Sequence, residues 1–221
     1  MSELPGWLRP LAGAIRDAGP LQFPSILAPE DAGARESAVL IAFCELVEGP
    51  GVLLIERAAT LRRHAGQVAF PGGALDPGDA DHEAAALREA SEEVGLDPRS
   101  VHPIAELPPI FIARSGYVVT PIVAWWQAPH PVAPVDAGEV ARVAVVAIAE
   151  LVDSANRFRV RHPSGLVGPG FDVQGMFVWG FTAVLLDALL SLAGWNRPWD
   201  ESRERPLPER ISGVPPTLPR S

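Results

Sequence analysis

Three glutamates and one arginine fall within nine residues of the chain, REASEEVGL at positions 88–96. On a helix that turns about 100° per residue, Glu89 and Glu93 lie about 40° apart, and Glu92 lies about 60° to the other side of Glu89. Carboxylates that share one helix face repel each other by a few tenths of a kcal/mol per pair. Such a face is either solvated or holds a cation, and hard divalent cations such as Mg²⁺ prefer these oxygen ligands.

The residues around the three glutamates favour the cation. The loop PGG at 71–73 leads toward the helix, and its glycines let backbone carbonyls and amides come close to a ligand. Arg88 stands one turn before Glu92, close enough to pair with that carboxylate and hold its rotamer. Residues 81–94 are rich in alanine and glutamate, which favour a helix, and Gly95 can end it.

The composition limits what the rest of the chain can be. Its 221 residues, 48% hydrophobic and 20% charged, suit one globular core with extensions. The net charge of −9 argues against a nucleic-acid binder, which is usually basic. Cys44 is the single cysteine and cannot form an internal disulfide, and residues 1–19 lack the apolar core of a signal peptide. We therefore expect a cytoplasmic protein. Asp187 within the most apolar helix argues for a packed helix, so we expect no membrane association.

Hydrophobic patterning predicts a mixed sheet with helices on its faces, an α/β (α+β) fold. Two strand-like runs around the turn EGPG form a plausible hairpin, and a long helix is predicted from about Met176 to Ala193. Before the core, residues 1–35 form an extension with one short helix. After it, residues 196–221 are rich in proline and charge, and we expect them to be disordered and the part after about residue 200 to be dispensable. The strands are predicted at residues 37–46, 51–58, 104–113, 117–126 and 140–148.

The helix and its loop resemble the Nudix hydrolase signature, G-x5-E-x7-R-E-U-x-E-E-x-G-U, in which U is aliphatic. The chain departs from it in having Asp79 at the first glutamate, with eight residues instead of seven before Arg88. The upstream stretch LLIERAATLRRHAGQVAFPGG at 53–73 resembles the coenzyme A subfamily pattern L-L-T-x-R-[SA]-x3-R-x3-G-x3-F-P-G-G, with Ile55 in place of threonine. The resemblance covers about residues 37–193. The residues that match the signature are Gly73, Arg88, Glu89, Ala90, Glu92, Glu93, Gly95 and Leu96.

The resemblance implies a Nudix domain at 36–195, with a mixed β-sheet sandwiched between helices. It implies metal-dependent hydrolysis of the diphosphate of coenzyme A, or of its acyl derivatives, to 3′,5′-ADP and 4′-phosphopantetheine. The expected cofactor is Mg²⁺ or Mn²⁺, since a cation is needed between an anionic substrate and an acidic site. Two alternatives stay open: a Nudix enzyme for ADP-ribose, NADH or a modified nucleoside triphosphate, and a ligand-binding module without turnover. The expected metal ligands are Glu89, Glu93, Glu92 and the carbonyl of Gly73.

The remaining roles are assigned to residues around this helix. The catalytic group comprises Arg88, which orients Glu92, and a general base that is either Glu92 or Glu139; Glu139 is equally compatible with a solvated loop acid. Arginine suits phosphate because its planar fork binds two oxygens, so we expect Arg62 to meet the 3′-phosphate of coenzyme A. The only partner we expect is a small nucleotide, and a homodimer is compatible with the sequence. The predicted substrate-binding residues are Arg57, Arg62, Gln67, Phe70 and Tyr117.

Overall fold

The computed structural model describes residues 3–17, 33–61, 64–113 and 115–208. Its main sheet runs in the order β3-β2-β1-β7-β5, while β4 pairs with β1, β6 with β7 and β8 with β2. The pair of β1 and β7 is parallel and its neighbours are antiparallel, so the sheet is mixed as predicted. Its strands are β1 (Arg35–Leu46), β2 (Gly49–Arg57), β3 (Val68–Ala69), β4 (Gly72–Ala74), β5 (Val101–Glu106), β6 (Ile110–Ile112), β7 (Tyr117–Trp126) and β8 (Val140–Ala147).

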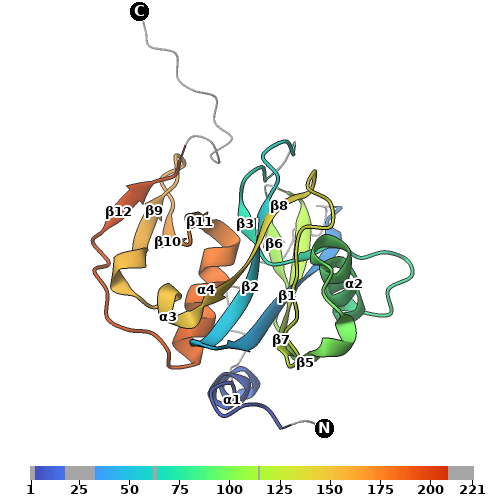
Figure 1. Ribbon diagram of the computed structural model, residues 1–221. Helices are drawn as coiled ribbons and strands as arrows, with labels where there is room; N and C mark the ends of the chain where they lie inside the picture. The colour runs from blue at the N-terminus through green and yellow to red at the C-terminus, as the bar shows by residue number, and fades with distance from the viewer. Residues whose placement is uncertain (1–2, 18–32, 62–63, 114, 209–221) are drawn as a thin grey trace, which may run out of the picture.

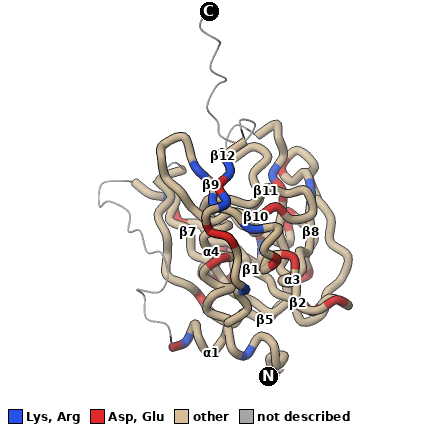
Figure 2. The backbone as a smooth tube through the Cα atoms, turned by 90° about the vertical axis from the view of Figure 1, so that its left-hand side faces the viewer, with Lys and Arg blue, Asp and Glu red and all other residues tan. Residues whose placement is uncertain are grey.

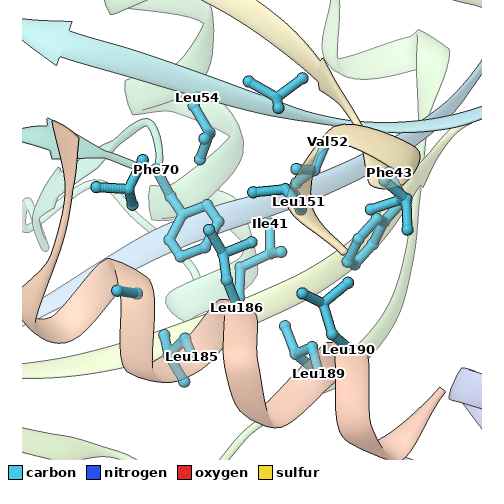
Figure 3. Packing of buried hydrophobic residues seen from close by; sticks show 14 of the residues in the cluster. Ile41, Phe43, Val52, Leu54, Phe70, Leu151, Leu185, Leu186, Leu189 and Leu190 are labelled. Carbon is cyan, nitrogen blue, oxygen red and sulfur yellow. The ribbon is translucent and has the colours of Figure 1, made fainter. Parts of the chain in front are cut away.

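Helices cover both faces of the main sheet (Figure 1). One face of β1 carries Leu40 and Cys44, which belong to the same buried cluster as the alanines of α2 (His82–Val94). The other face carries Ile41 and Phe43, which pack with the leucines of α4 (Gly180–Leu192), as Figure 3 shows. Alternate residues of the strand therefore bury two separate apolar layers, which fixes the register of β1 in the centre of the molecule.

The N-terminal segment packs against α4 and the residues that follow it, at one end of the core. Helix α1 (Arg9–Asp17) lies below the sheet and contacts α4. The Trp7 ring lies 6.1 Å from that of Trp195, and Trp195 lies 5.8 Å from Phe43, measured between ring centroids. None of the helices in the described parts of the chain has the length and apolar character needed to span a membrane.

A second sheet lies beside α4 and was not predicted. Its order is β11-β10-β9-β12, with β9 (Arg157–Arg161), β10 (Val167–Val173), β11 (Met176–Val178) and β12 (Glu204–Pro206). A short helix, α3 (Ile148–Leu151), leads toward it. Arginines and acidic residues lie side by side around β9 and β12 (Figure 2), where Arg161 pairs with Glu204 at 2.7 Å.

Two predictions from the sequence for this region differ from the observed structure. The long helix does not begin at Met176: that residue starts β11, and α4 begins only at Gly180. The expectation of a disordered tail from 196 is wrong for β12, which pairs in parallel with β9. Leu207 just after β12 is 7% exposed and packs in a small cluster with Phe158, so this part of the tail has a core of its own. The rest of the predicted tail, from residue 209, lies outside the described residues.

Candidate functional site

Helix α2 has well-defined ends that set the position of its glutamates. The Asp81 side chain accepts a hydrogen bond from the Ala84 N–H at 2.8 Å, which caps the first turn. Gly95 ends the helix at φ +71°, a left-handed conformation that glycine adopts without strain. Between these ends, the buried alanines pack in the cluster that includes β1. Glu93 and Glu89 contact residues of β2 and β4, and Glu92 is exposed.

Glu93 is a buried carboxylate at the junction of three elements. Its Oε2 accepts a hydrogen bond from the Gly72 N–H at 3.0 Å, and its Oε1 lies 3.6 Å from Nη1 of Arg57. Its side chain is only 6% exposed, and burial raises its pKa to about 7. The hydrogen bond from Gly72 and the charge of Arg57 oppose this rise, and the charges of Glu89 and Glu139 add to it. The negative charge of Glu93 is therefore only partly balanced by the protein.

Glu89 lies directly against the backbone of the glycine loop. A Cβ atom added to Gly73 would stand 2.5 Å from the Glu89 carboxyl carbon and from Oε1, so only glycine leaves room for this carboxylate. Gly72 has a similar requirement, because its φ is +156° and a Cβ would lie 2.3 Å from the carbonyl oxygen of Ala38. Burial also raises the pKa of Glu89, and hydrogen bonding to Arg88 opposes the rise. Both glycines thus allow backbone and carboxylate to approach closely.

Arg88 holds the acidic face together. Its Nε and Nη2 donate to the two carboxylate oxygens of Asp79, each at 3.0 Å. Its Nη1 donates to Glu89 and to Glu92, also at 3.0 Å, and Nη2 reaches the carbonyl of Ala74. The bond to Asp79 raises the pKa of Arg88 and lowers that of Asp79. The pairing of Arg88 with Glu92 was expected, whereas the part of Asp79 was missed because it stands one residue out of register with the signature.

The donor set of the site fits a hard divalent cation. Glu89 and Glu93 offer oxygen ligands whose pKa values are raised mainly by burial, because the charged carboxylates lose solvation that a bound cation would replace. Within the described ranges, no three Asp, Glu, His or Cys side chains already converge on one point. Mg²⁺ does not require such a cage, since it commonly takes one or two carboxylates, substrate phosphates and waters.

The other predicted site residues divide into those near Glu93 and those farther away. Glu139 is exposed, and its carbonyl accepts a hydrogen bond from Ala58 at 2.9 Å, just after Arg57. Its charge contributes to the raised pKa of Glu93, so the two carboxylates are neighbours. Tyr117 opens β7, where the Arg35 guanidinium lies 4.3 Å from its ring centroid. In the parallel pair of β1 and β7, Tyr117 lies opposite Arg35. Both residues lie at the end of β1 that pairs with β4.

Phe70 and Arg62, two predicted substrate-binding residues, are not seen at the site in the described part of the chain. Phe70 was expected to contact substrate, but its side chain is 2% exposed and packs in the core with Leu54 and Leu186 (Figure 3). Its aromatic ring supports the base of the loop and faces away from solvent, so that prediction is wrong. Arg62 lies outside the described residues, and its predicted contact with a 3′-phosphate stays a prediction.

Comparisons with known proteins place these residues in a family. The model of the NUDIX domain matches residues 35–165, from the first residue of β1 to the loop between β9 and β10. The chain is 44% identical over 164 residues to the uncharacterized Nudix hydrolase NudL of Cronobacter sakazakii, covering 70% of this chain and 81% of that protein. It is 41% identical over 167 residues to the NudL protein of Citrobacter koseri, covering 72% and 83%.

A solved structure agrees at the level of the fold. The Nudix hydrolase RenU of M. smegmatis superimposes with a TM-score of 0.50 at 20% sequence identity, covering 76% of this chain and 90% of that one. The predicted fold class is confirmed by this likeness. The acidic helix, its arginine and its glycine loop all lie inside the matched region. The chain therefore belongs to the Nudix family and is a hydrolase that acts on a diphosphate substrate.

Proposed function

We propose that the protein hydrolyses the diphosphate linkage of coenzyme A, or of its acyl derivatives, to 3′,5′-ADP and 4′-phosphopantetheine or acyl-phosphopantetheine. The observation that carries the proposal is the position of residues 53–73, whose sequence resembles the coenzyme A subfamily pattern. The described residues of this segment include the end of β2, β3 and the start of β4. It brings Arg57 against Glu93 and Gly73 against Glu89, so it forms one wall of the acidic site.

The acidic helix supplies the groups that would hold Mg²⁺ or Mn²⁺. Glu89 and Glu93 are the first ligands, with Glu92 and the carbonyl oxygen of Gly73 completing the set. A bound divalent ion would neutralise charge between carboxylate and phosphate and lower the pKa of a coordinated water. Arg88 fixes Glu89 and Glu92 through one nitrogen, Nη1, and so restricts both side chains before any ion arrives.

The protein's own groups can orient the substrate and accept a proton. Arg57 stands 3.6 Å from Glu93, a distance that leaves its guanidinium N–H groups available to phosphate oxygens. Glu92 is engaged by Arg88, whereas the exposed side chain of Glu139 accepts no hydrogen bond from the described residues. We therefore assign the general base to Glu139, with Glu92 as the alternative, and assign Gln67 and Tyr117 to the nucleotide or pantetheine.

A substrate panel tests this function. Coenzyme A, acetyl-coenzyme A, ADP-ribose, NADH and dGTP are incubated separately with the protein and Mg²⁺ or Mn²⁺, and products are separated by liquid chromatography. The expected result is the highest kcat/KM for coenzyme A or its acetyl ester, with 3′,5′-ADP as one product. Glu93→Gln serves as the control for contaminating hydrolases. If coenzyme A and its ester are cleaved no better than ADP-ribose, NADH or dGTP, the proposed substrate is wrong.

A further inference from the structure

The loop between β2 and β3 places a glutamine directly opposite Arg57. The Arg57 N–H donates to the Gln67 carbonyl at 2.9 Å, and the Gly66 N–H donates to the Arg57 carbonyl at 3.1 Å. The pairing of β2 with β3 ends at Glu56 and Val68. Beyond it, Gly66, at φ +64°, and Gln67 together oppose Arg57, as in a β-bulge with glycine at its first position, and Gln67 keeps the register of the strand. Residues directly opposite each other in an antiparallel pair point to the same face. Gln67 therefore lies on the face where Arg57 reaches Glu93.

Gln67 in turn fixes the ring of His64. The Nδ1 atom of His64 lies 2.9 Å from Oε1 of Gln67. A carbonyl oxygen can only accept a hydrogen bond, so Nδ1 carries the hydrogen and Nε2 is the nitrogen left for another partner. Nε2 makes no hydrogen bond within the described parts of the chain. The carbonyl of His64 also accepts from the Gln67 N–H at 3.2 Å, which ties the backbone as well as the ring.

The backbone of His64 is in a conformation that its side chain does not favour. Its φ is +56°, and among the described non-glycine residues only Gln174 shares a positive φ. Gln174 has a local reason, since it and Gly175 form the two-residue turn between β10 and β11, which needs positive φ at both positions. His64 lies in a longer loop with no such turn, and its unusual backbone instead directs the imidazole toward Gln67.

The charges of the site show why the phosphates of the substrate need another hydrogen-bond donor. An anionic diphosphate must approach Glu89, Glu93 and Glu139, and burial leaves the first two carboxylates poorly solvated. Arg88 is occupied by its hydrogen bonds to Asp79 and the glutamates of its own helix. A further donor next to Arg57 would therefore strengthen the binding of phosphate.

We infer that Nε2 of His64 contacts the phosphate oxygens of the bound diphosphate, beside Arg57, and that Gln67 positions the ring for this contact. With the Nδ1 hydrogen bound to Gln67, Nε2 donates to phosphate in the form of the ring that carries a hydrogen on both nitrogens. The inference rests on the diphosphate chemistry of the family and goes beyond the proposed function, because it does not depend on coenzyme A being the substrate. His64 is then a substrate-binding residue, and Gln67 positions it through Oε1 in addition to the contact with nucleotide or pantetheine proposed above.

Three substitutions at one position separate the contact from the shape of the loop. His64→Asn keeps an N–H close to the place of Nδ1 and tolerates positive φ, but it has nothing at the place of Nε2. His64→Gln places an amide N–H near Nε2 and loses the group at Nδ1. His64→Ala removes both. His102→Asn is the matched control, since His102 lies in β5 beside Trp125, at the other end of β7 from Tyr117.

The readout is KM and kcat, measured with whichever diphosphate in the substrate panel the wild type cleaves best, together with the Tm of each variant. We expect KM to rise about tenfold for His64→Asn and His64→Ala, equal to about 1.4 kcal/mol, with kcat little changed. His64→Gln should recover most of the loss, and His102→Asn should match the wild type. If His64→Asn has the KM of the wild type, the ring only shapes the loop and the inference is overturned. A preference for ADP-ribose over coenzyme A would refute the proposed function but leave this comparison valid.

Discussion

Glu93 carries its negative charge at a position where the metal-free fold disfavours it. Its side chain is 6% exposed, and burial raises its pKa to about 7 from an ordinary value of 4.5. Since the folded protein binds this proton more tightly than the unfolded chain, the group's contribution to stability is full below pH 4.5. That contribution is lost as the pH rises through about 7. At pH 8 the ionised Glu93 therefore destabilises the metal-free protein.

The cost is large enough to measure. The interval from 4.5 to about 7 corresponds to about 3 kcal/mol at 1.36 kcal/mol per pH unit. Glutamine at this position cannot ionise, and it keeps an oxygen for the Gly72 N–H, although it gives up the attraction to Arg57. Glu93→Gln should therefore raise the Tm of the metal-free protein at pH 8 by about 6 °C, taking about 2 °C per kcal/mol for a chain of this size. Near pH 4.5 the difference should vanish.

Calorimetry of chelator-treated protein at both pH values measures this effect. The control is Glu83→Gln, which removes an exposed carboxylate from the same helix and should give no gain at pH 8. Adding Mg²⁺ should stabilise the wild type more than Glu93→Gln, and the variant should lose most of its activity despite its higher Tm. A metal-free variant that melts at or below the wild-type temperature at pH 8 would refute the reasoning about buried charge.

Three further results are expected. Gly73→Ala should lower kcat by about tenfold or more, with a smaller change in Tm, because the added Cβ displaces the Glu89 carboxylate. Gly78→Ala is the control: a Cβ there has open space, so this variant should behave as the wild type in the same assays. Phe70→Ala should lower the free energy of unfolding, measured by chemical denaturation, by about 3–5 kcal/mol, because the ring is buried. KM of the folded fraction should be unchanged, and a raised KM would show that the ring contacts the substrate. Deletion of residues 201–221 should lower Tm because it removes β12, and an unchanged melting curve would show that this strand adds nothing to stability.

The acidic helix was the part of the structure most open to prediction from sequence. Its content of alanine and glutamate and its terminal glycine indicate the same segment, and α2 spans His82–Val94 between Asp81 and Gly95. The hairpin of β1 and β2 was equally clear, since two apolar runs flank a glycine-rich turn. In both cases the local sequence signals and the packing of the element agree.

The second sheet escaped prediction because its strands are short and carry many arginines. β9 reads RFRVR, and its charged side chains are compensated by residues distant in sequence, as in the pair of Arg161 with Glu204. The turn before β11 uses Gln174 and Gly175, which is a weaker signal than Asn-Gly. The apolar residues of β11 run directly into α4, so hydrophobicity alone could not separate strand from helix.

The departure at Asp79 shows what the acidic helix requires of its surroundings. Asp79 has a shorter side chain and a longer spacing to Arg88 than the signature, yet it binds both Nε and Nη2 of that guanidinium and is 6% exposed. Because one edge of the planar guanidinium is taken by Asp79, its Nη1 is left to bind Glu89 and Glu92. The acidic helix therefore requires a carboxylate that reaches this edge of the Arg88 guanidinium, and the number of residues between that carboxylate and Arg88 can vary. Glu93 makes no hydrogen bond with Arg88; it contacts Gly72 and Arg57, which belong to strands of the sheet. It therefore keeps a charge that a cation would neutralise.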